Sequence, residues 1–538
     1  MASKEQFILL AKLSMIAVTL LGLTACRSVM QASDIYIAQN AMGANNGQDC
    51  SDAHPSSFFN NSSNWGSGAP IGPGTTVHLC GVFTGAAGST MLTAQGSGTS
   101  GNRITIKFES GALLTSPYWS GAGAIVVSGR SYITVDGGSG GIIQDTANGT
   151  GLSYHQSSVG IQALPCNNCE FENLTIQNLY VHVICEASGG CDNSVDQTQV
   201  NAIQFQGSNL LIHDNVLHDV GWALYQNYTN DSNVQIYNNN IYNMDHGLAC
   251  AGAAYTVSTE YVYSNHFHDM ANWDTGAADS YHHDGIHCFN GSGGKIQNLY
   301  VYNNLFDGNE GNCCVTAWMF LEAKTDGTPW GDSSSTAYVW NNVVIGSLDL
   351  GNGQLYVGVG SGSEFLNNTI VVNNPANGIC IAAAGGATNI TIENNVLEGC
   401  NQVIGASSAG SYSTIDYNLY AHANGGNPVW QFGSASASSL KEWQSACNCD
   451  SHSQANLSST LPLSSTGVPG STYSGAFGIN LIGLASGNLR ALASDTTAGD
   501  TRTASSRLGT GAWTVGAYSL GTSSPPPMPP TQLSAKAQ

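Results

Sequence analysis

A short asparagine-containing pattern recurs through the middle of the chain and restricts its fold more than any other feature. Each copy has an apolar residue, one spacer, a polar pair that usually ends in asparagine, and a second apolar stretch, as in residues 236–241 and 392–397. The second asparagines of these pairs are Asn173, Asn215, Asn239, Asn265, Asn304, Asn342, Asn368, Asn395 and Asn418. They lie 23 to 42 residues apart, with a base period near 25. A short period with occasional excess indicates a solenoid with loop insertions.

The residues between the asparagines favour strands. The repeats are rich in Asn, Gly, Ser, Thr, Val, Ile and Tyr, which suit strands and tight turns. Asparagines stacked at one corner can bond their amides to the next coil and form a ladder. We therefore predict an all-β chain with a single right-handed parallel β-helix. The alternative, a β-propeller, expects about 40 to 45 residues per blade, which is longer than the base spacing here.

Several segments resemble known β-helix proteins. They are an opening segment at 34–38, a Pro-Gly turn and strand at 73–77, late segments at 443–444 and 450–453, and a closing segment at 511–518. Together with the asparagine-rich coils, they resemble the secreted bacterial parallel β-helix proteins of the pectate-lyase-like superfamily. The resemblance implies one β-helix domain over residues 34–520. It is specific for fold and weak for reaction, because a fold does not define a function.

The two ends of the chain are predicted to lie outside this domain. Lys4 and Lys12 precede a short apolar run that is typical of a signal peptide over residues 1–25. That run ends in Leu23-Thr24-Ala25-Cys26, which resembles a bacterial lipobox and implies that Cys26 is lipidated, followed by a short tether over 26–33. The resemblance implies export and an outer-membrane lipid anchor; a plain secretory signal is the alternative. The proline-rich segment 521–538 is predicted to be a disordered tail.

Cysteine usage agrees with export. Of 15 cysteines, 14 remain when Cys26 is set aside, enough for seven disulfides in an oxidising compartment. Plausible local pairs are Cys50 with Cys80, Cys185 with Cys191, and Cys380 with Cys400. We expect Cys166 and Cys169 to form a structural bridge, because no second CxxC or histidine pair lies nearby for zinc.

Charge limits the classes of partner. The chain has 13 basic and 35 acidic residues, with a net charge of −22. Nucleic acid is excluded as a partner because its phosphates require Lys and Arg. A hydrophobic content of 42% is enough for a core. We expect a monomer that acts on a polysaccharide.

Two oversized spacings, between Asn265 and Asn342, hold a concentration of reactive side chains. The first contains Trp273, Asp274, Asp279, Tyr281, His282, His283, Asp284 and His287, and the second contains Glu310, Trp318, Glu322, Lys324, Asp326, Trp330 and Asp332. The preceding coil adds Asp245-His246-Gly247. Stacked coils lie about 4.8 Å apart, so residues at one phase should converge.

Carboxylates beside aromatic residues suit a carbohydrate substrate. Hydrolysis of a glycosidic bond needs one protonated and one ionised carboxyl group, and Asp284 with Asp279, Glu310 or Glu322 could supply the pair. We predict a catalytic patch of Asp284, His283, Glu310 and Glu322. Substrate contacts are assigned to Trp273, Tyr281, His287, Trp318 and Trp330. Residues 284–287 also resemble the first catalytic motif of polygalacturonase-type hydrolases, although residues 311–315 lack that family's aspartate pair.

Other interpretations stay open. A polysaccharide lyase would use Lys324 as its base, helped by calcium. Calcium could bind Asp274, Asp279 and Asp284, since it prefers oxygen ligands; no other cofactor is predicted. His282, His283 and His287 could bind a metal, transfer protons or only stack. A non-catalytic carbohydrate-binding surface protein or adhesin is the third hypothesis.

Overall fold

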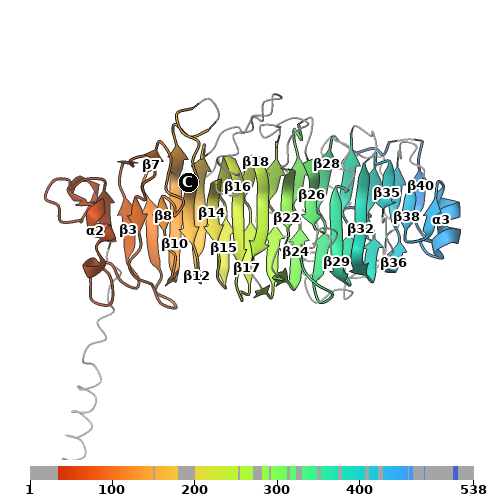
Figure 1. Cartoon of the computed structure of the whole chain (residues 1–538), viewed down its shortest axis with the longest axis horizontal. Helices are drawn as coiled ribbons and strands as arrows, with labels where there is room; N and C mark the ends of the chain where they lie inside the picture. Colours follow the sequence, from red (N-terminus) through yellow and green to blue (C-terminus); the bar gives the residue numbers. More distant parts are fainter. Residues whose placement is uncertain are drawn as a thin grey trace, which may run out of the picture.

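The chain forms an elongated parallel β-helix, as predicted (Figure 1). The computed structural model describes residues 34–149, 152–179, 200–252, 255–270, 282–289, 293–311, 315–322, 330–347, 353–373, 378–405, 411–421, 428–458, 460–463, 478 and 513–518. The predicted signal peptide, tether and tail, Cys26, and the pair Cys185 and Cys191 lie outside these ranges. No helix in the described ranges is long and apolar enough to cross a bilayer.

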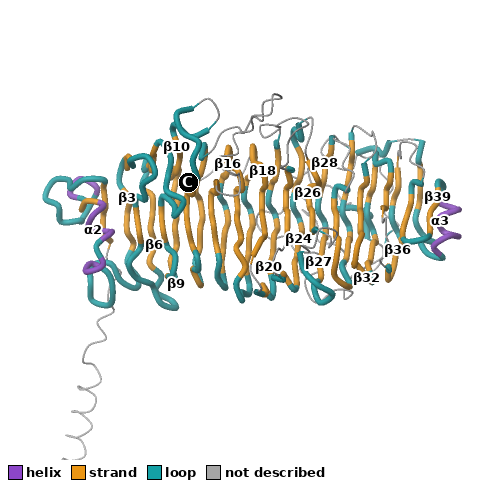
Figure 2. Tube along the Cα trace, in the orientation of Figure 1, coloured by secondary structure: helices purple, strands orange, loops and turns teal. Residues whose placement is uncertain are grey.

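The strand pairings define three parallel stacks, to which successive coils contribute strands. The strands lie side by side along the length of the molecule (Figure 2). The first stack is β1 (Asp34–Ala38), β3 (Thr76–Leu79), β6 (Ile104–Phe108), β10 (Ile133–Asp145), β13 (Glu170–Gln177), β15 (Leu210–His213), β17 (Val234–Tyr237), β20 (Glu260–Tyr263), β24 (Asn298–Tyr302), β27 (Thr336–Trp340), β30 (Glu364–Leu366), β33 (Ile390–Glu393) and β36 (Tyr412–Asp416).

The second stack shares β10 and β13 and continues through longer strands that turn a corner. It comprises β4 (Val82–Thr84), β7 (Leu113–Ser116), β16 (Val216–Tyr228), β18 (Asn240–Gly252), β21 (His266–His268), β25 (Leu305–Asp307), β28 (Val343–Gly346), β31 (Thr369–Val372), β34 (Val396–Glu398), β37 (Leu419–Ala421) and β40 (Gln454–Asn456).

The third stack shares β16 and β18 and carries the residues of interest. It comprises β5 (Leu92–Thr93), β8 (Ile125–Val126), β11 (Ser158–Ala163), β14 (Val200–Phe205), β22 (His283–Cys288), β26 (Val315–Leu321), β29 (Leu355–Ser361), β32 (Ile379–Thr388), β35 (Gln402–Gly405) and β38 (Trp430–Phe432).

Short elements complete the described fold. They are β2 (His54–Pro55), β9 (Arg130–Ser131), β12 (Cys166–Asn167), β19 (Thr256–Val257), β23 (Lys295–Ile296), β39 (Ala435–Ala437), the 3-10 helices η1 (Cys50–Asp52) and η2 (Ser62–Asn64), α2 (Ser56–Asn60) and α3 (Leu440–Cys447). Helices α2 and α3 lie at opposite ends of the solenoid (Figure 1). The interior is filled by the inward-facing apolar side chains of all three stacks. Parallel strands are usually buried, and here each stack covers the inner faces of the other two.

The predicted asparagine ladder runs along the corner between the first and second stacks. Each amide donates a hydrogen bond of 2.9 to 3.1 Å to the side-chain oxygen of the next asparagine, from Asn215 to Asn418. All eight side chains are buried. The residue before each one has a left-handed backbone, which Asn and Asp tolerate best. This explains the polar pair in the sequence pattern.

The prediction was wrong for Asn173, which is not part of the ladder. It occupies the left-handed position, with φ of 58°, and not the ladder position. Leu174 takes the ladder position, and its backbone N–H donates to the side-chain oxygen of Asn215 at 3.0 Å. A one-residue shift in the polar pair therefore moves the asparagine from the buried corner to the turn before it.

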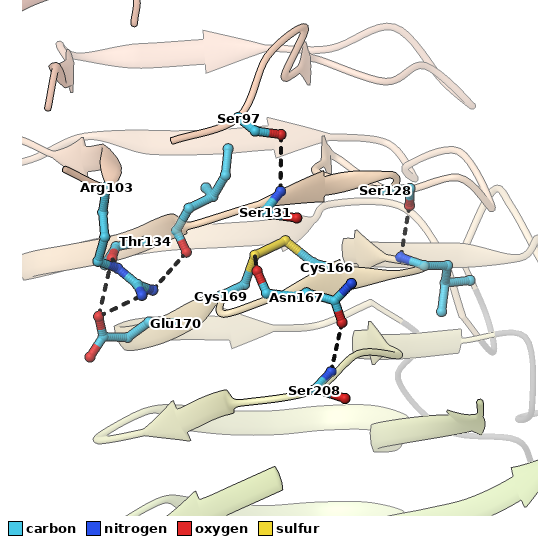
Figure 3. The surroundings of a disulfide bond; sticks show 12 residues. Ser97, Arg103, Ser128, Ser131, Thr134, Cys166, Asn167, Cys169, Glu170 and Ser208 are labelled. Carbon is cyan, nitrogen blue, oxygen red and sulfur yellow. Dashed lines mark hydrogen bonds and ion pairs between the residues drawn. A yellow bond between two sulfur atoms is a disulfide. The ribbon is translucent and has the colours of Figure 1, made fainter. Parts of the chain in front are cut away.

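The expected bridges Cys50–Cys80, Cys166–Cys169 and Cys380–Cys400 are present. Figure 3 shows that the Cys166–Cys169 disulfide closes a short turn near the Arg103–Glu170 ion pair. Two further bridges, Cys250–Cys288 and Cys447–Cys449, were not predicted from the sequence. The first of these joins register partners on β18 and β22, inside the core.

Candidate functional site

Three neighbouring strands of the third stack, β18, β22 and β26, bring polar side chains together near the middle of the solenoid (Figure 1). His246 on β18 is the register partner of Asp284 on β22. Each is followed by a glycine. A Cβ atom at Gly247 or Gly285 would lie 2.5 Å from a backbone carbonyl oxygen of the next coil. The two glycines therefore let the coils approach closely at this point.

Four side chains form what we call the histidine cluster: His246, His282, Asp284 and His287. The carboxylate oxygen Oδ2 of Asp284 lies 3.3 Å from His282 Nε2, 3.5 Å from His246 Nε2 and 3.7 Å from His287 Nδ1. His287 Nδ1 in turn lies 3.0 Å from His246 Nε2 and 3.3 Å from His282 Nε2. Three imidazole nitrogens and one carboxylate oxygen thus converge on a single point.

Asp245 orients the cluster from behind. It accepts hydrogen bonds from His246 Nδ1 at 2.6 Å and His283 Nδ1 at 2.8 Å. Burial favours its neutral form, but His246 and His283 together outweigh this, so the pKa of Asp245 lies below its usual range. A carboxylate that accepts a hydrogen bond from Nδ1–H keeps the proton on that nitrogen, so the Nε2 lone pair of His246 is directed at the cluster.

Asp284 is buried in an unusual environment. Its Oδ1 accepts a hydrogen bond from the backbone of Ala317 at 2.9 Å, whereas its buried Oδ2 accepts none from the described residues. Burial, and then the charges of Asp245 and Glu322, raise the pKa of Asp284 well above its usual value. Burial, and then His246 and His282, hold the pKa of His287 well below its usual value.

The solvent side of the cluster is formed by His282, Glu322 and aromatic rings. The His282 side chain is 41% exposed and that of Glu322 is 18% exposed, whereas His287 and Asp284 are buried. Glu322 Oε2 lies 3.5 Å from His287 Nε2. The rings of Phe289 and Phe320 lie with centroids 4.7 and 5.2 Å from that of His287. A substrate would therefore meet an imidazole and a carboxylate beside two aromatic side chains.

The residues predicted to be catalytic, substrate-binding or calcium-binding separate into three groups. Asp284, His287 and Glu322 lie together, and His283 lies behind them on Asp245. Glu310 is buried, and its carboxylate accepts a hydrogen bond of 2.7 Å from the Ser347 hydroxyl of the next coil, which gives it a role in closing that turn. Trp273, Asp274, Asp279, Tyr281 and Lys324 lie outside the described residues.

Trp318 and Trp330 do not fit their predicted role in stacking on the substrate. Both side chains are fully buried. Trp318 packs against Phe306, and the Trp330 indole donates to the carbonyl of Val359 at 3.1 Å. A ring must present a face to solvent before it can stack on a sugar. Phe289, Phe320 and Trp222 are aromatic residues that the described structure places at the cluster.

Sequence reasoning noted Asp245 and His246 but left them out of the predicted site. A signal for them existed. Asp245-His246-Gly247 and His283-Asp284-Gly285 are similar triplets 38 residues apart, and the structure pairs His246 with Asp284 at that offset. Two similar triplets, each with a histidine and an aspartate before a glycine, were therefore the sequence signal that these residues lie next to each other on adjacent coils.

The donor set decides which cations fit. Three nitrogens and one oxygen suit first-row transition metals, whereas calcium takes six to eight oxygen ligands. At Asp284 the described neighbours are nitrogens, so the predicted calcium site does not fit there; its other two residues lie outside the described ranges.

Comparison with known proteins gives backbone matches only. No family model matches the chain, and no curated protein matches it by sequence. Among solved structures, pectate lyase Pel9A matches with a TM-score of 0.45 and 14% identity, covering 91% of this chain and 96% of that one. A mannuronic acid specific polysaccharide family 6 lyase from human gut microbiota has a TM-score of 0.42 and 12% identity, covering 72% of this chain and 81% of that one. The GH136 lacto-N-biosidase from Eubacterium ramulus has a TM-score of 0.42 and 12% identity, covering 72% and 68%.

Proposed function

We propose that this protein is an exported enzyme that cleaves glycosidic bonds in an extracellular polysaccharide, with its active centre at the histidine cluster. The observation that carries the proposal is the register match of β18, β22 and β26, which collects Asp284, His287 and Glu322 beside two partly exposed aromatic residues. The net charge of −22 favours a neutral or weakly charged glycan over a polyanion.

Hydrolysis is the reaction that we place first. Asp284 and Glu322 flank opposite nitrogens of His287, at 3.7 and 3.5 Å, so two carboxyl groups stand on either side of one imidazole. Glu322 is the carboxyl group that solvent reaches, and it is the one that we expect to contact the substrate. Asp284 is covered by the histidines, and we expect it to act through them as a positioning residue.

Elimination is the second candidate, and one observation favours it. The most exposed group of the cluster is His282, and an imidazole can take a proton from a carbon next to a uronate carboxylate. Lys324, the base predicted for this reaction, stays a prediction outside the described residues.

The role of Glu322 can be tested by measuring the activity of the parent protein and of Glu322→Gln on a panel of polysaccharides. The parent protein should release new reducing ends, and Glu322→Gln should lower the rate at least 100-fold, since a positioned acid or base contributes 10²–10⁴-fold. Glu442→Gln, on the exposed surface of α3, is the matched control and should keep full activity.

The products of that assay distinguish hydrolysis, elimination and binding without cleavage. Reducing ends without ultraviolet absorbance support hydrolysis, and both signals together support elimination. Full activity in Glu322→Gln would remove this residue from the centre. Silence on every polysaccharide would favour the binding-protein or adhesin interpretation.

Export and membrane attachment complete the proposal. Five disulfides among the described residues support an oxidising compartment. We propose a lipid anchor at Cys26, which mass spectrometry of the mature N-terminus would detect as a diacylated cysteine.

A further inference from the structure

We infer that the histidine cluster is a binding site for one divalent first-row transition-metal ion, of which zinc is the probe, with His246, His282, Asp284 and His287 as protein ligands. The inference concerns the same residues as the proposed active centre, but it stands on geometry and does not require activity. The inferred ion is one that prefers nitrogen ligands, in place of the calcium predicted from the sequence.

The spacing of the donor atoms matches a tetrahedral ion. With metal–ligand bonds of about 2.0–2.1 Å, the corners of a tetrahedron lie roughly 3.3 Å apart by simple geometry. Five of the six donor separations lie between 3.0 and 3.7 Å, and all four atoms lie within 4.8 Å of one another. Strands β18 and β22, with His282 directly before β22, thus hold the ligands at the separation that a metal would impose.

The chemistry of Asp284 needs a cation at this point. Its Oδ2 is buried and accepts no hydrogen bond from the described residues, although three imidazole nitrogens surround it. A buried carboxylate oxygen without a donor is costly. A dication at the centre would supply the missing positive charge and use the nitrogen lone pairs at the same time.

The surroundings have the arrangement that supports metal-binding histidines. Such a histidine usually donates its other ring N–H to a carboxylate, which fixes its tautomer and orientation. His246 does so to Asp245 at 2.6 Å, and Asp245 is itself held by His283 at 2.8 Å. His287 directs its other ring nitrogen at Glu322. His282, half-exposed, lies on the side from which an ion and a substrate would enter.

A second group of similar residues serves as an internal comparison. Glu170, Glu172 and His213 also place their polar atoms within 4.8 Å of one another. Arg103 already lies 3.5 Å from Glu170 (Figure 3), and His213 is hydrogen-bonded to Asp214 at 2.7 Å and faces Glu170 at 3.2 Å. These carboxylates already have cationic partners, so we expect no metal there.

The test measures metal content directly. The full chain is stripped with a chelator, dialysed, and titrated with zinc chloride by calorimetry, with bound metal counted by elemental analysis. We expect one equivalent of zinc per chain, and cobalt in its place should give the visible absorption of a low-coordinate nitrogen site. His246→Asn and His282→Ala should lower the affinity at least tenfold, and Asp245→Asn, which changes only the positioning, should lower it ten- to 100-fold.

The controls separate this site from other histidines. His452→Ala, at the exposed surface, and His213→Asn, in the second group, should keep the full equivalent. Each variant is checked by circular dichroism, and His282→Ala alters a half-exposed side chain, so its fold should survive. Absence of bound zinc in the folded parent, or a full equivalent in both His246→Asn and His282→Ala, overturns the inference. Zinc binding without cleavage of any glycan contradicts the proposed function only, and cleavage without metal contradicts this inference only.

Discussion

Replacing Asn304 by alanine is expected to lower the free energy of unfolding by about 4 kcal/mol. The Asn304 side chain makes four hydrogen bonds in the middle of the ladder. Its amide donates to Val262 O at 2.9 Å and to Asn342 Oδ1 at 3.0 Å, and its oxygen accepts from the backbone and side-chain nitrogens of Asn265 at 3.0 and 3.1 Å. Because the position is fully buried, water cannot replace these bonds.

Chemical denaturation followed by circular dichroism would measure this effect. The matched control is Asn209→Gly, at an asparagine that also bonds its coil neighbours but lies at the surface. Its φ of 55° suits glycine, so we expect a change below about 1 kcal/mol. Equal stabilities of the two variants would mean that the ladder contributes no more than surface bonds do.

Replacing Glu260 by glutamine is expected to stabilise the protein at alkaline pH. Glu260 on β20 is fully buried; its Oε2 accepts a hydrogen bond from Gln226 at 2.7 Å, and its Oε1 accepts none from the described residues. Burial, and then the charge of Asp231, raise the pKa of Glu260 from 4.5 to about 8, against the opposing hydrogen bond from Gln226. The folded protein therefore keeps this proton over a range in which the unfolded chain has lost it.

The direction of the pH effect follows from that shift. Between pH 4.5 and about 8 the folded state binds more protons at this residue than the unfolded state, so stability falls as pH rises. Glutamine stays neutral and can still accept from Gln226. The Glu260→Gln variant should match the parent near pH 4.5 and exceed it by roughly 5 kcal/mol at pH 9.

Denaturation midpoints at pH 5, 7 and 9 would check this result, with the exposed Glu442→Gln as the control that should follow the parent at every pH. If Glu260→Gln and the parent change in parallel across this range, Glu260 is ionised in the folded protein, and a cation or a further donor must neutralise it.

Local patterns in the chain were enough to determine the architecture. A β-helix repeats one physical requirement in every coil, a buried polar corner beside alternating apolar residues, so the asparagine period reports the fold directly. The ladder from Asn215 to Asn418 and the Cys380–Cys400 bridge follow from such local signals. The Asn173 error marks the limit: a polar pair does not say which of its two residues faces the corner, and only the pairing of β13 with β15 decides that.

The site depended on contacts between coils. Asp284, His287 and Glu322 stand out in the sequence because reactive residues gather in two adjacent insertions, but His246 joins them only through the 38-residue register between β18 and β22. The burial of Trp318 and Trp330 likewise follows from tertiary packing: Trp318 packs against Phe306 across its own coil, and Trp330 bonds to Val359 of the next coil. The sequence by itself determined the repeating fold, because its signals lie within one coil. Only the tertiary structure decided which side chains meet. The insertions differ in length, so the number of residues between two side chains in contact differs from one pair of coils to the next.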